Sequence, residues 1–243
     1  MTYFATRELS RSFGGVVAVD RVTVEVQEGR VNGLIGPNGC GKTTFFNLVT
    51  GMIRPDGGVI TFKDRDLAGV RPHQVALAGI GRTFQVTRLF PRMTVMQNML
   101  VAVRRRSVRE LAANAVRGDD VERAEMWLTR VGIEHLKDTE ARDLSYGQQK
   151  LLEIAGLLMG DPELILLDEP AGGVNPVMVE RISTLVRELN AEGKTFLVVE
   201  HNMEMVMSLC DHIVVFDRGA PVAVGPPEEI RKDQRVLEAY LGG

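Results

Sequence analysis

The stretch that decides the fold is Gly36-Pro37-Asn38-Gly39-Cys40-Gly41-Lys42-Thr43-Thr44. It fits G-x-x-x-x-G-K-[ST], the pattern of a phosphate-binding loop. Glycines let such a backbone approach a phosphate closely, and the helix that follows offers free N–H groups and the positive end of its dipole. The sequence therefore predicts a nucleotide site in which Lys42 reaches the β- and γ-phosphates and the Thr43 hydroxyl contacts Mg²⁺.

The neighbours of this loop support the interpretation. Residues 31–35 form a short, largely apolar run that predicts a strand feeding the loop. Residues 43–50 are predicted as a helix that ends at Gly51. Without these neighbours the pattern would be a glycine-rich turn with a surface lysine, whereas the order strand, loop, helix favours nucleotide binding.

The rest of the chain predicts an α/β fold. Apolar and polar residues alternate over 22–26, as in a half-exposed strand. Further strands are predicted at 59–62, 164–167, 195–200 and 213–217, with a helix over 177–190. Strands that alternate with helices indicate a mostly parallel sheet covered on both faces.

The middle of the chain has a different pattern. From about residue 89 to residue 158, β-branched runs give way to helical spacing, as in Val121, Ala124, Leu128 and Val131. We therefore expect one domain over 1–243, in which 1–88 and 159–243 form the core and 89–158 form a helical insert.

Two acids follow the apolar strand at 164–167. Ligands of open α/β folds bind at the carboxyl edge of the sheet, where Asp168 and Glu169 are expected to lie. We expect Asp168 to hold Mg²⁺ through its water shell and Glu169 to accept a proton from the attacking water, or to orient that water. The alternative is a solvated acidic pair at the end of a strand.

Composition sets the class of protein. The chain has 243 residues, 44% hydrophobic and 25% charged, which is ordinary for a soluble globular domain. The net charge of −3 gives no global basic field that would favour nucleic acid. No apolar run approaches the ~20 residues of a membrane helix. Two cysteines make no disulfide framework, and the N-terminus has no signal-peptide pattern, so we expect cytoplasmic residence.

A further segment indicates the family. Leu144-Ser145-Tyr146-Gly147-Gln148 resembles the signature motif of ATP-binding cassette (ABC) ATPases, although Tyr146 stands where the family usually has glycine. The resemblance implies that Ser145, Gly147 and Gln148 cap the γ-phosphate of ATP held by a second ABC ATPase chain. It also implies a P-loop NTPase (RecA-like) core with an antiparallel β subdomain and a helical insert. The alternative for this segment is a plain helix N-cap.

The resemblance extends to single residues along the whole chain. Phe13 matches the aromatic that stacks on adenine, although a core aromatic remains the alternative. Gln85 matches the glutamine that links the Mg²⁺ site to the helical insert and the membrane partner, and His201 matches the histidine that contacts the γ-phosphate. Asn175 replaces the usual aspartate of the loop that contacts the opposite subunit. Metal contacts are thus implied for Thr43, Gln85 and, through water, Asp168.

Within the family, the chain is similar to the ATPases of branched-chain amino-acid importers. The resemblance rests on residues 79–85, 88–90 and 93–95, the Asn175-Pro176 loop, and residues 200–203 and 238–242. It implies ATP and Mg²⁺ as cofactors, a second ATPase chain (the same or homologous), two transmembrane permease subunits and a solute-binding protein, with the chain on the inner face of the cell membrane. Lipopolysaccharide or lipid exporter ATPases and urea importer ATPases share several of these segments and remain alternatives.

Proteins of other classes are less compatible with the sequence. Soluble ABC ATPases that act on DNA or ribosomes carry long coiled coils or two cassettes in one chain, and neither is present. A kinase or GTPase would not need residues 144–148 or His201, and the guanine-reading segment of GTPases is missing.

Two local features raise separate hypotheses. Cys40 lies inside the phosphate loop, so a thiol adduct there would block ATP, unless Cys40 is only a small filler. Arg104, Arg105, Arg106 and Arg109 form a basic cluster, predicted as a solvated helix face, with contact to lipid headgroups as the minority interpretation.

Overall fold

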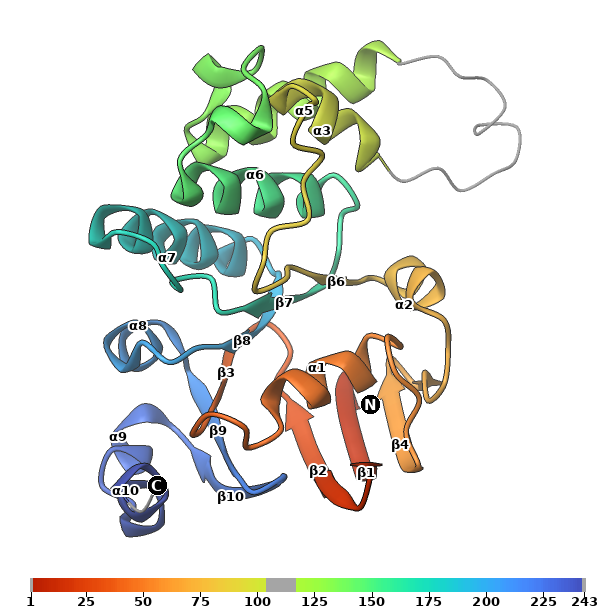
Figure 1. The fold of residues 1–243 in the computed structure, drawn as a ribbon, viewed down its shortest axis with the longest axis vertical. Coiled ribbons are helices and arrows are strands. Elements are labelled where there is room, and N and C mark those ends of the chain that lie inside the picture. Colours follow the sequence, from red (N-terminus) through yellow and green to blue (C-terminus); the bar gives the residue numbers. More distant parts are fainter. Residues whose placement is uncertain (1, 104–116, 242–243) are drawn as a thin grey trace. The chain divides into compact units, whose positions relative to one another are not determined.

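The computed structural model describes residues 2–103 and 117–241, so the predicted cluster at Arg104–Arg106 and Arg109 lies outside the described residues. The chain forms two compact units (Figure 1). The sheet unit comprises 1–82, 163–169 and 186–243, and the helical unit comprises 83–162 and 170–185.

A mostly parallel sheet forms the centre of the sheet unit. Its strands run in the order β10-β9-β3-β8-β7-β6, and only the β9–β10 pair is antiparallel. The strands are β3 (Val31–Ile35), β6 (Ile80–Arg82), β7 (Leu164–Asp168), β8 (Thr195–Val199), β9 (His212–Asp217) and β10 (Ala220–Gly225). Every residue of β3, β7 and β8 is buried, so both faces of the sheet are covered, as predicted.

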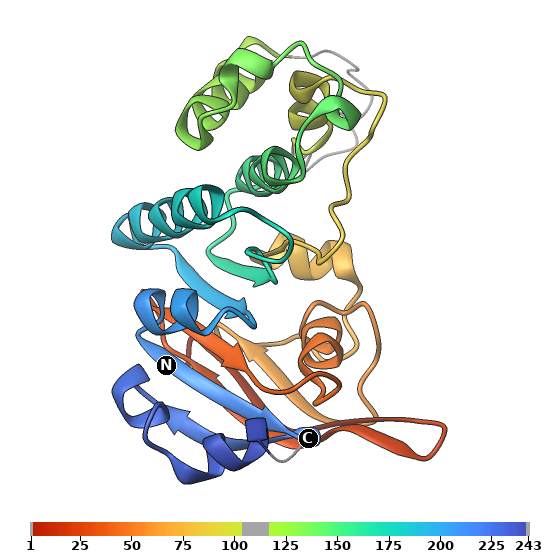
Figure 2. The same cartoon turned by 60° about the vertical axis from the view of Figure 1, so that its left-hand side comes forward.

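A second, antiparallel sheet has the order β2-β1-β4-β5. Its strands are β1 (Phe4–Phe13), β2 (Val16–Val26), β4 (Gly57–Phe62) and β5 (Arg65–Asp66). The hairpin of β1 and β2, red in Figure 2, turns at Gly14-Gly15. In β2 the valines at 22, 24 and 26 are buried while Thr23 and Glu25 are exposed, which is the predicted alternation.

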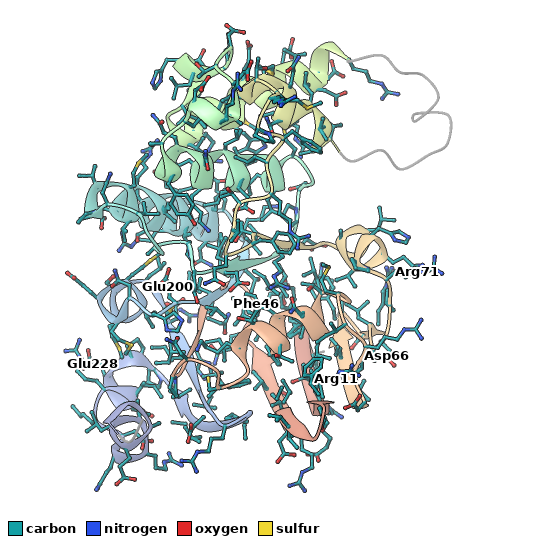
Figure 3. All side chains as sticks on the ribbon, viewed as in Figure 1. Arg11, Phe46, Asp66, Arg71, Glu200 and Glu228 are labelled. Carbon is teal, nitrogen blue, oxygen red and sulfur yellow. The ribbon has the colours of Figure 1, made fainter. Side chains whose placement is uncertain are left out.

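Helix α1 (Lys42–Val49) follows the phosphate loop and packs into the core. Phe45 and Phe46 belong to a buried cluster that also contains residues of β1, β2 and β4 and of β3, β7, β8 and β9 (Figures 1 and 3). Burial of each such ring contributes about 1.5–3 kcal/mol. The helix ends at Val49 with Thr50 as its C-cap, and Gly51 follows with φ +70°, which confirms the predicted stop.

Besides α1 and residues 186–191 of α7, the described part of the sheet unit contains four helices. They are α2 (Pro72–Ala78), α8 (Met203–Leu209), α9 (Pro227–Ile230) and α10 (Gln234–Leu241). The long helix α7 (Pro176–Ala191) agrees with its predicted position and continues from the helical unit into the sheet unit.

The helical unit contains α3 (Val95–Val101), α5 (Gly118–Val131), α6 (Tyr146–Leu158) and the start of α7. Two short 3-10 turns, η1 (Glu134–Leu136) and η2 (Ala141–Asp143), connect α5 to α6. Ala124, Leu128 and Val131 form the buried side of α5, as their spacing predicted. Within the two described ranges, no helix is long and apolar enough to cross a membrane.

Candidate nucleotide site

Strand register brings the predicted catalytic segments to one edge of the parallel sheet. Leu34 of β3 pairs with Val199 of β8, and Val199 pairs with Asp168 of β7. Adjacent strands lie about 4.8 Å apart. The start of the phosphate loop, Asp168 and the residues after β8 therefore leave the sheet side by side at its carboxyl edge, where ligands of open α/β folds bind.

The phosphate loop requires its glycines for steric reasons. Gly36 has φ +148° and Gly41 has φ +105°. A Cβ on Gly36 would lie 2.2 Å from the Phe216 carbonyl oxygen, and one on Gly41 would lie 2.2 Å from the Ala18 carbonyl oxygen. No side chain fits at either position, because the loop packs directly against the backbone of β9 and β2.

The ammonium group of Lys42 lies inside the phosphate loop. Its Nζ donates hydrogen bonds to the carbonyl oxygens of Gly36 and Pro37, each at 2.8 Å, and lies 3.6 Å from the Cys40 Sγ. The side chain is buried. The loop therefore wraps around an ammonium group at the N-terminus of α1, and the first turn of that helix contains no acidic residue that would oppose an anion.

Glu169 and His201 face one another across the sheet edge. The His201 Nε2 and the Glu169 Oε1 are 2.9 Å apart. Glu169 has φ +49°, a left-handed conformation that costs a non-glycine residue about 1 kcal/mol. Its N–H donates to the Val199 carbonyl oxygen at 2.9 Å, which fixes this turn. Strain of this kind concentrates at functional sites.

Glu200 was not predicted as a site residue, and its side chain fixes the backbone at His201. It is buried, and its Oε2 accepts hydrogen bonds from the backbone N–H groups of His201 at 2.9 Å and Asn202 at 3.0 Å. The sequence signal that could have indicated Glu200 is a carboxylate directly after an apolar strand. Such a carboxylate is expected to be buried, and a buried carboxylate requires hydrogen-bond donors.

Asp168 is buried at the end of β7, and Arg82 at the end of β6 forms an ion pair with it at 2.8 Å. Arg82 was not predicted as a site residue. Asp168 and the exposed hydroxyl-bearing Thr43 supply the hard oxygen ligands that Mg²⁺ prefers, so these residues fit the predicted metal.

Phe13 ends β1 and is 45% exposed, so it is not the core aromatic of the alternative interpretation. The Arg11 guanidinium carbon lies 4.8 Å from its ring centre. A hollow of about 640 Å³ borders the phosphate loop, lined by residues 37–40, the β9–β10 turn and the α10 residues Arg235, Glu238 and Ala239.

In the helical unit, the signature segment starts α6. The Ser145 Oγ accepts a hydrogen bond from the Gln148 N–H at 3.4 Å, and the Gln148 Oε1 accepts one from the Ser145 N–H at 2.9 Å. This capping box is the N-cap of the alternative interpretation. It also fixes the Ser145 hydroxyl at the N-terminus of a helix, so the two roles are compatible in geometry.

Gly147 and the loop before α7 pack closely against each other. A Cβ on Gly147 would lie 2.9 Å from the Met178 Cγ. Asn175 caps α7, because its Oδ1 accepts a hydrogen bond from the Met178 N–H at 3.0 Å. Asparagine performs this capping as well as aspartate, so the substitution preserves the loop without its charge.

Gln85 is anchored by its backbone to α6. Its carbonyl oxygen accepts hydrogen bonds from the Lys150 Nζ at 2.8 Å and the Tyr146 hydroxyl at 3.1 Å. Lys150 also bonds the Phe84 carbonyl, and Glu153 accepts from the Phe84 N–H at 3.1 Å. Burial raises the pKa of Glu153, partly offset by that N–H and by Lys150. One face of α6 thus holds the glutamine segment.

Comparison with known proteins identifies the family. A profile of the ABC transporter family matches residues 19–172, and a profile of the branched-chain amino acid ATP-binding cassette transporter matches residues 220–243. The chain belongs to the ABC transporter family. The high-affinity branched-chain amino acid transport ATP-binding protein LivG of Salmonella typhimurium is 42% identical, covering 98% of this chain and 97% of that protein. The corresponding protein BraF of Pseudomonas aeruginosa is also 42% identical, over 96% of this chain and 95% of its own length.

Solved structures of this family have the same fold. A nucleotide-free ATP-binding cassette from an ABC transporter superposes with a TM-score of 0.90 at 35% identity, over the whole of both chains. The ADP conformation of an ATP-binding cassette of an ABC transporter gives 0.89 at 34% identity, again over both whole chains. This ABC ATPase is therefore a nucleotide-binding subunit whose ATP hydrolysis powers transport.

Proposed function

We propose that this ABC ATPase powers the uptake of branched-chain amino acids. The observation that carries the proposal is the match of residues 220–243 to the branched-chain amino acid cassette profile, outside the region that the general ABC profile covers. Full-length similarity to LivG and BraF supports the same solute class.

The phosphate loop and Asp168 are proposed to bind the triphosphate of ATP together with Mg²⁺. Lys42 pairs with the β- and γ-phosphates, and the glycine backbone and the first turn of α1 donate N–H groups to them. Thr43 and Asp168, the latter through water, would hold Mg²⁺, and Gln85 would be a further contact. When bound, Mg²⁺ neutralises charge that develops on the phosphate oxygens. Phe13 stacks on adenine.

Glu169 and His201 are proposed to carry the chemistry. The Glu169 Oε1 and the His201 Nε2 lie 2.9 Å apart, so the two side chains are within hydrogen-bond distance of each other. Glu169 accepts a proton from the attacking water or orients that water, and His201 contacts the γ-phosphate. The catalytic gain then comes from positioning and electrostatics rather than from covalent chemistry.

A second ABC ATPase chain is proposed to complete each site. Its Ser145, Gly147 and Gln148 would cap the γ-phosphate held by this chain, and the same residues here would cap the partner's nucleotide. Gln85 would transmit the state of the site to the helical unit and the permease. The complex would contain two transmembrane subunits and receive its solute from a binding protein, with this chain on the inner face of the membrane.

Isolation of the tagged protein with its native membrane partners tests this proposal. Mass spectrometry should find two polytopic proteins, a second ATPase and a solute-binding protein, and uptake of labelled leucine should stop in cells that carry only Glu169→Gln. Copurification of lipid- or lipopolysaccharide-export components would overturn the solute assignment. Uptake of urea in place of leucine would do the same.

A further inference from the structure

Arg82 is a buried cation beside the predicted Mg²⁺ site, and nothing in the proposed mechanism accounts for it. The side chains of Arg82 and Asp168 are only 6% and 3% exposed, and the Arg82 Nη2 donates to the Asp168 Oδ2 at 2.8 Å. Lysine, aspartate and arginine are rarely buried to this degree unless they are paired. The buried Arg82–Asp168 ion pair is therefore a structural part of the carboxyl edge of the sheet.

Strand pairing explains why the two side chains meet. Arg82 is in register with Leu166 on the parallel neighbour β7, and Asp168 follows two residues after Leu166. Side chains two residues apart share a face of the sheet. Leu166 belongs to the core cluster that contains α1, so Arg82 and Asp168 are on the α1 side.

The other half of the guanidinium is fixed to α1. Its Nη1 donates to the Asn47 Oδ1 at 2.7 Å and to the Thr50 Oγ1 at 3.1 Å, and its central carbon lies 5.4 Å from the centre of the Phe46 ring. Helix α1 begins at Lys42, immediately after the phosphate loop. Arg82 thus connects the helix that carries Lys42 and Thr43 to the carboxylate at the end of β7.

Arginine suits this place because its planar fork is always charged and makes several directed hydrogen bonds. One bond sets the direction of the Asp168 carboxylate, and two others set the distance from that carboxylate to α1. We propose that Arg82 is a positioning residue for magnesium: it holds Asp168 in the orientation that accepts the metal-bound water. This inference rests on the proposed function, because it assumes that Mg²⁺ accompanies the nucleotide at this edge.

Calorimetry of ADP binding, with and without Mg²⁺, tests the role without relying on turnover. Wild-type protein should bind ADP more tightly with Mg²⁺ than with a chelator. Arg82→Lys keeps the charge and loses the fork. We expect it to reduce the Mg²⁺-dependent gain in ADP affinity about tenfold or more, as loss of a charge-assisted hydrogen bond does, and to leave Mg²⁺-free ADP affinity nearly unchanged.

Two further variants separate positioning from folding. Asn47→Ala removes one anchor of Arg82 on α1 and keeps the ion pair, so it should shift the Mg²⁺ dependence in the same direction by less. If Arg82→Lys does not fold, Asn47→Ala decides the question. Arg30→Lys is the matched control, because Arg30 forms an exposed pair with Asp211 at 3.6 Å in the same unit, and it should change nothing.

The possible results are distinct. A wild-type protein whose ADP affinity ignores Mg²⁺ would overturn the proposed metal site and this inference with it. In a second case the wild-type protein responds to Mg²⁺ normally. If Arg82→Lys and Asn47→Ala then lose ADP affinity equally with and without Mg²⁺, or lose none, Arg82 contributes to stability alone. That result would leave the proposed function intact and overturn only the positioning role.

Discussion

At the scale of single residues, Glu169 combines the features expected of the group that handles the attacking water. It sits at the carboxyl edge of the sheet, has a strained backbone at φ +49°, and is paired with His201 at 2.9 Å. Its backbone N–H donates to the Val199 carbonyl oxygen, a bond that does not involve the carboxylate. A change confined to the carboxylate should therefore leave the local fold in place.

Glu169→Gln keeps the size of the side chain and removes its capacity to accept a proton. We expect ATP affinity to stay near the wild-type value and turnover to fall ~10²–10⁴-fold, the usual contribution of a general base. Steady-state phosphate release and nucleotide titration measure the two quantities. Glu228→Gln, at an exposed position of α9, is the control. Near-normal turnover in Glu169→Gln would remove this residue from catalysis.

Cys40 gives a second test at the residue scale. The thiol is buried in the phosphate loop, and burial raises its pKa despite the nearby Lys42 ammonium. Since the thiolate is the reactive form, alkylation should be slow near neutral pH and accelerate as pH rises. Bound ATP should slow it further by covering the loop.

The Cys210→Ser background isolates Cys40 in this experiment, because these are the two cysteines of the chain. Burial raises the pKa of Cys210 to about 12, so its own reaction should be slower still. Mass spectrometry of alkylated protein over time gives the rate. Equal rates with and without ATP would refute the proposed blocking of the site by a thiol adduct.

At the scale of elements, α6 connects two predicted functional segments of the helical unit. It starts at the signature residues, and its Tyr146 and Lys150 hold the Gln85 carbonyl. Tyr146, which departs from the usual glycine, also packs near Gly173: a Cβ there would lie 3.3 Å from its ring. The signature helix and the glutamine segment should therefore behave as one body.

Lys150→Met tests this connection. The buried ammonium bonds two carbonyls, so its loss should cost about 1–3 kcal/mol in unfolding free energy and speed amide exchange in residues 83–88. Hydrogen exchange by mass spectrometry measures the segment directly. Lys137→Met, which breaks an exposed pair with Glu125, should have little effect. Equal protection of the amides of residues 83–88 in Lys150→Met and Lys137→Met would argue against the connection.

Elements also differ in how far the sequence predicts them. Continuous apolar runs identified β3, β7, β8 and β9 to within about a residue, because strands buried on both faces leave that signature. Strand β1 was not predicted: its register shifts against β2 and β4, and charged Arg7 and Glu8 interrupt the alternation. Bulged strands lose the period of two on which such prediction depends.

The same limit applies to the site. The phosphate loop is a contiguous motif, so its residues could be read from the sequence. Arg82 and Asp168 are 86 positions apart and meet only because β6 pairs with β7. Pairing of short strands is decided by tertiary packing, and a three-residue strand such as β6 carries too little pattern to predict its neighbour.

At the scale of the whole molecule, the predicted nucleotide contacts are divided between the two units. The phosphate loop, Asp168, Glu169 and His201 belong to the sheet unit, whereas Gln85 and the signature segment belong to the helical unit. ATP bound to one chain should therefore stabilise the sheet unit first. If the two units unfold in separate thermal transitions, ATP should raise the unfolding temperature of the sheet unit only.

Thermal unfolding of Glu169→Gln with Mg²⁺ and ATP measures this response while hydrolysis is slow. ATP at a hundredfold excess over its Kd should add ~2.7 kcal/mol of stability. At ~2–4 °C per kcal/mol for a protein of this size, Tm should rise by roughly 5–10 °C. Adding Lys42→Ala should remove the shift, because that ammonium is the positive group inside the loop. The unliganded double variant must retain its circular dichroism spectrum, since Lys42 also bonds two loop carbonyls. A folded double variant that still gained the full shift would show that ATP binds without Lys42, and the phosphate loop would lose its assigned role.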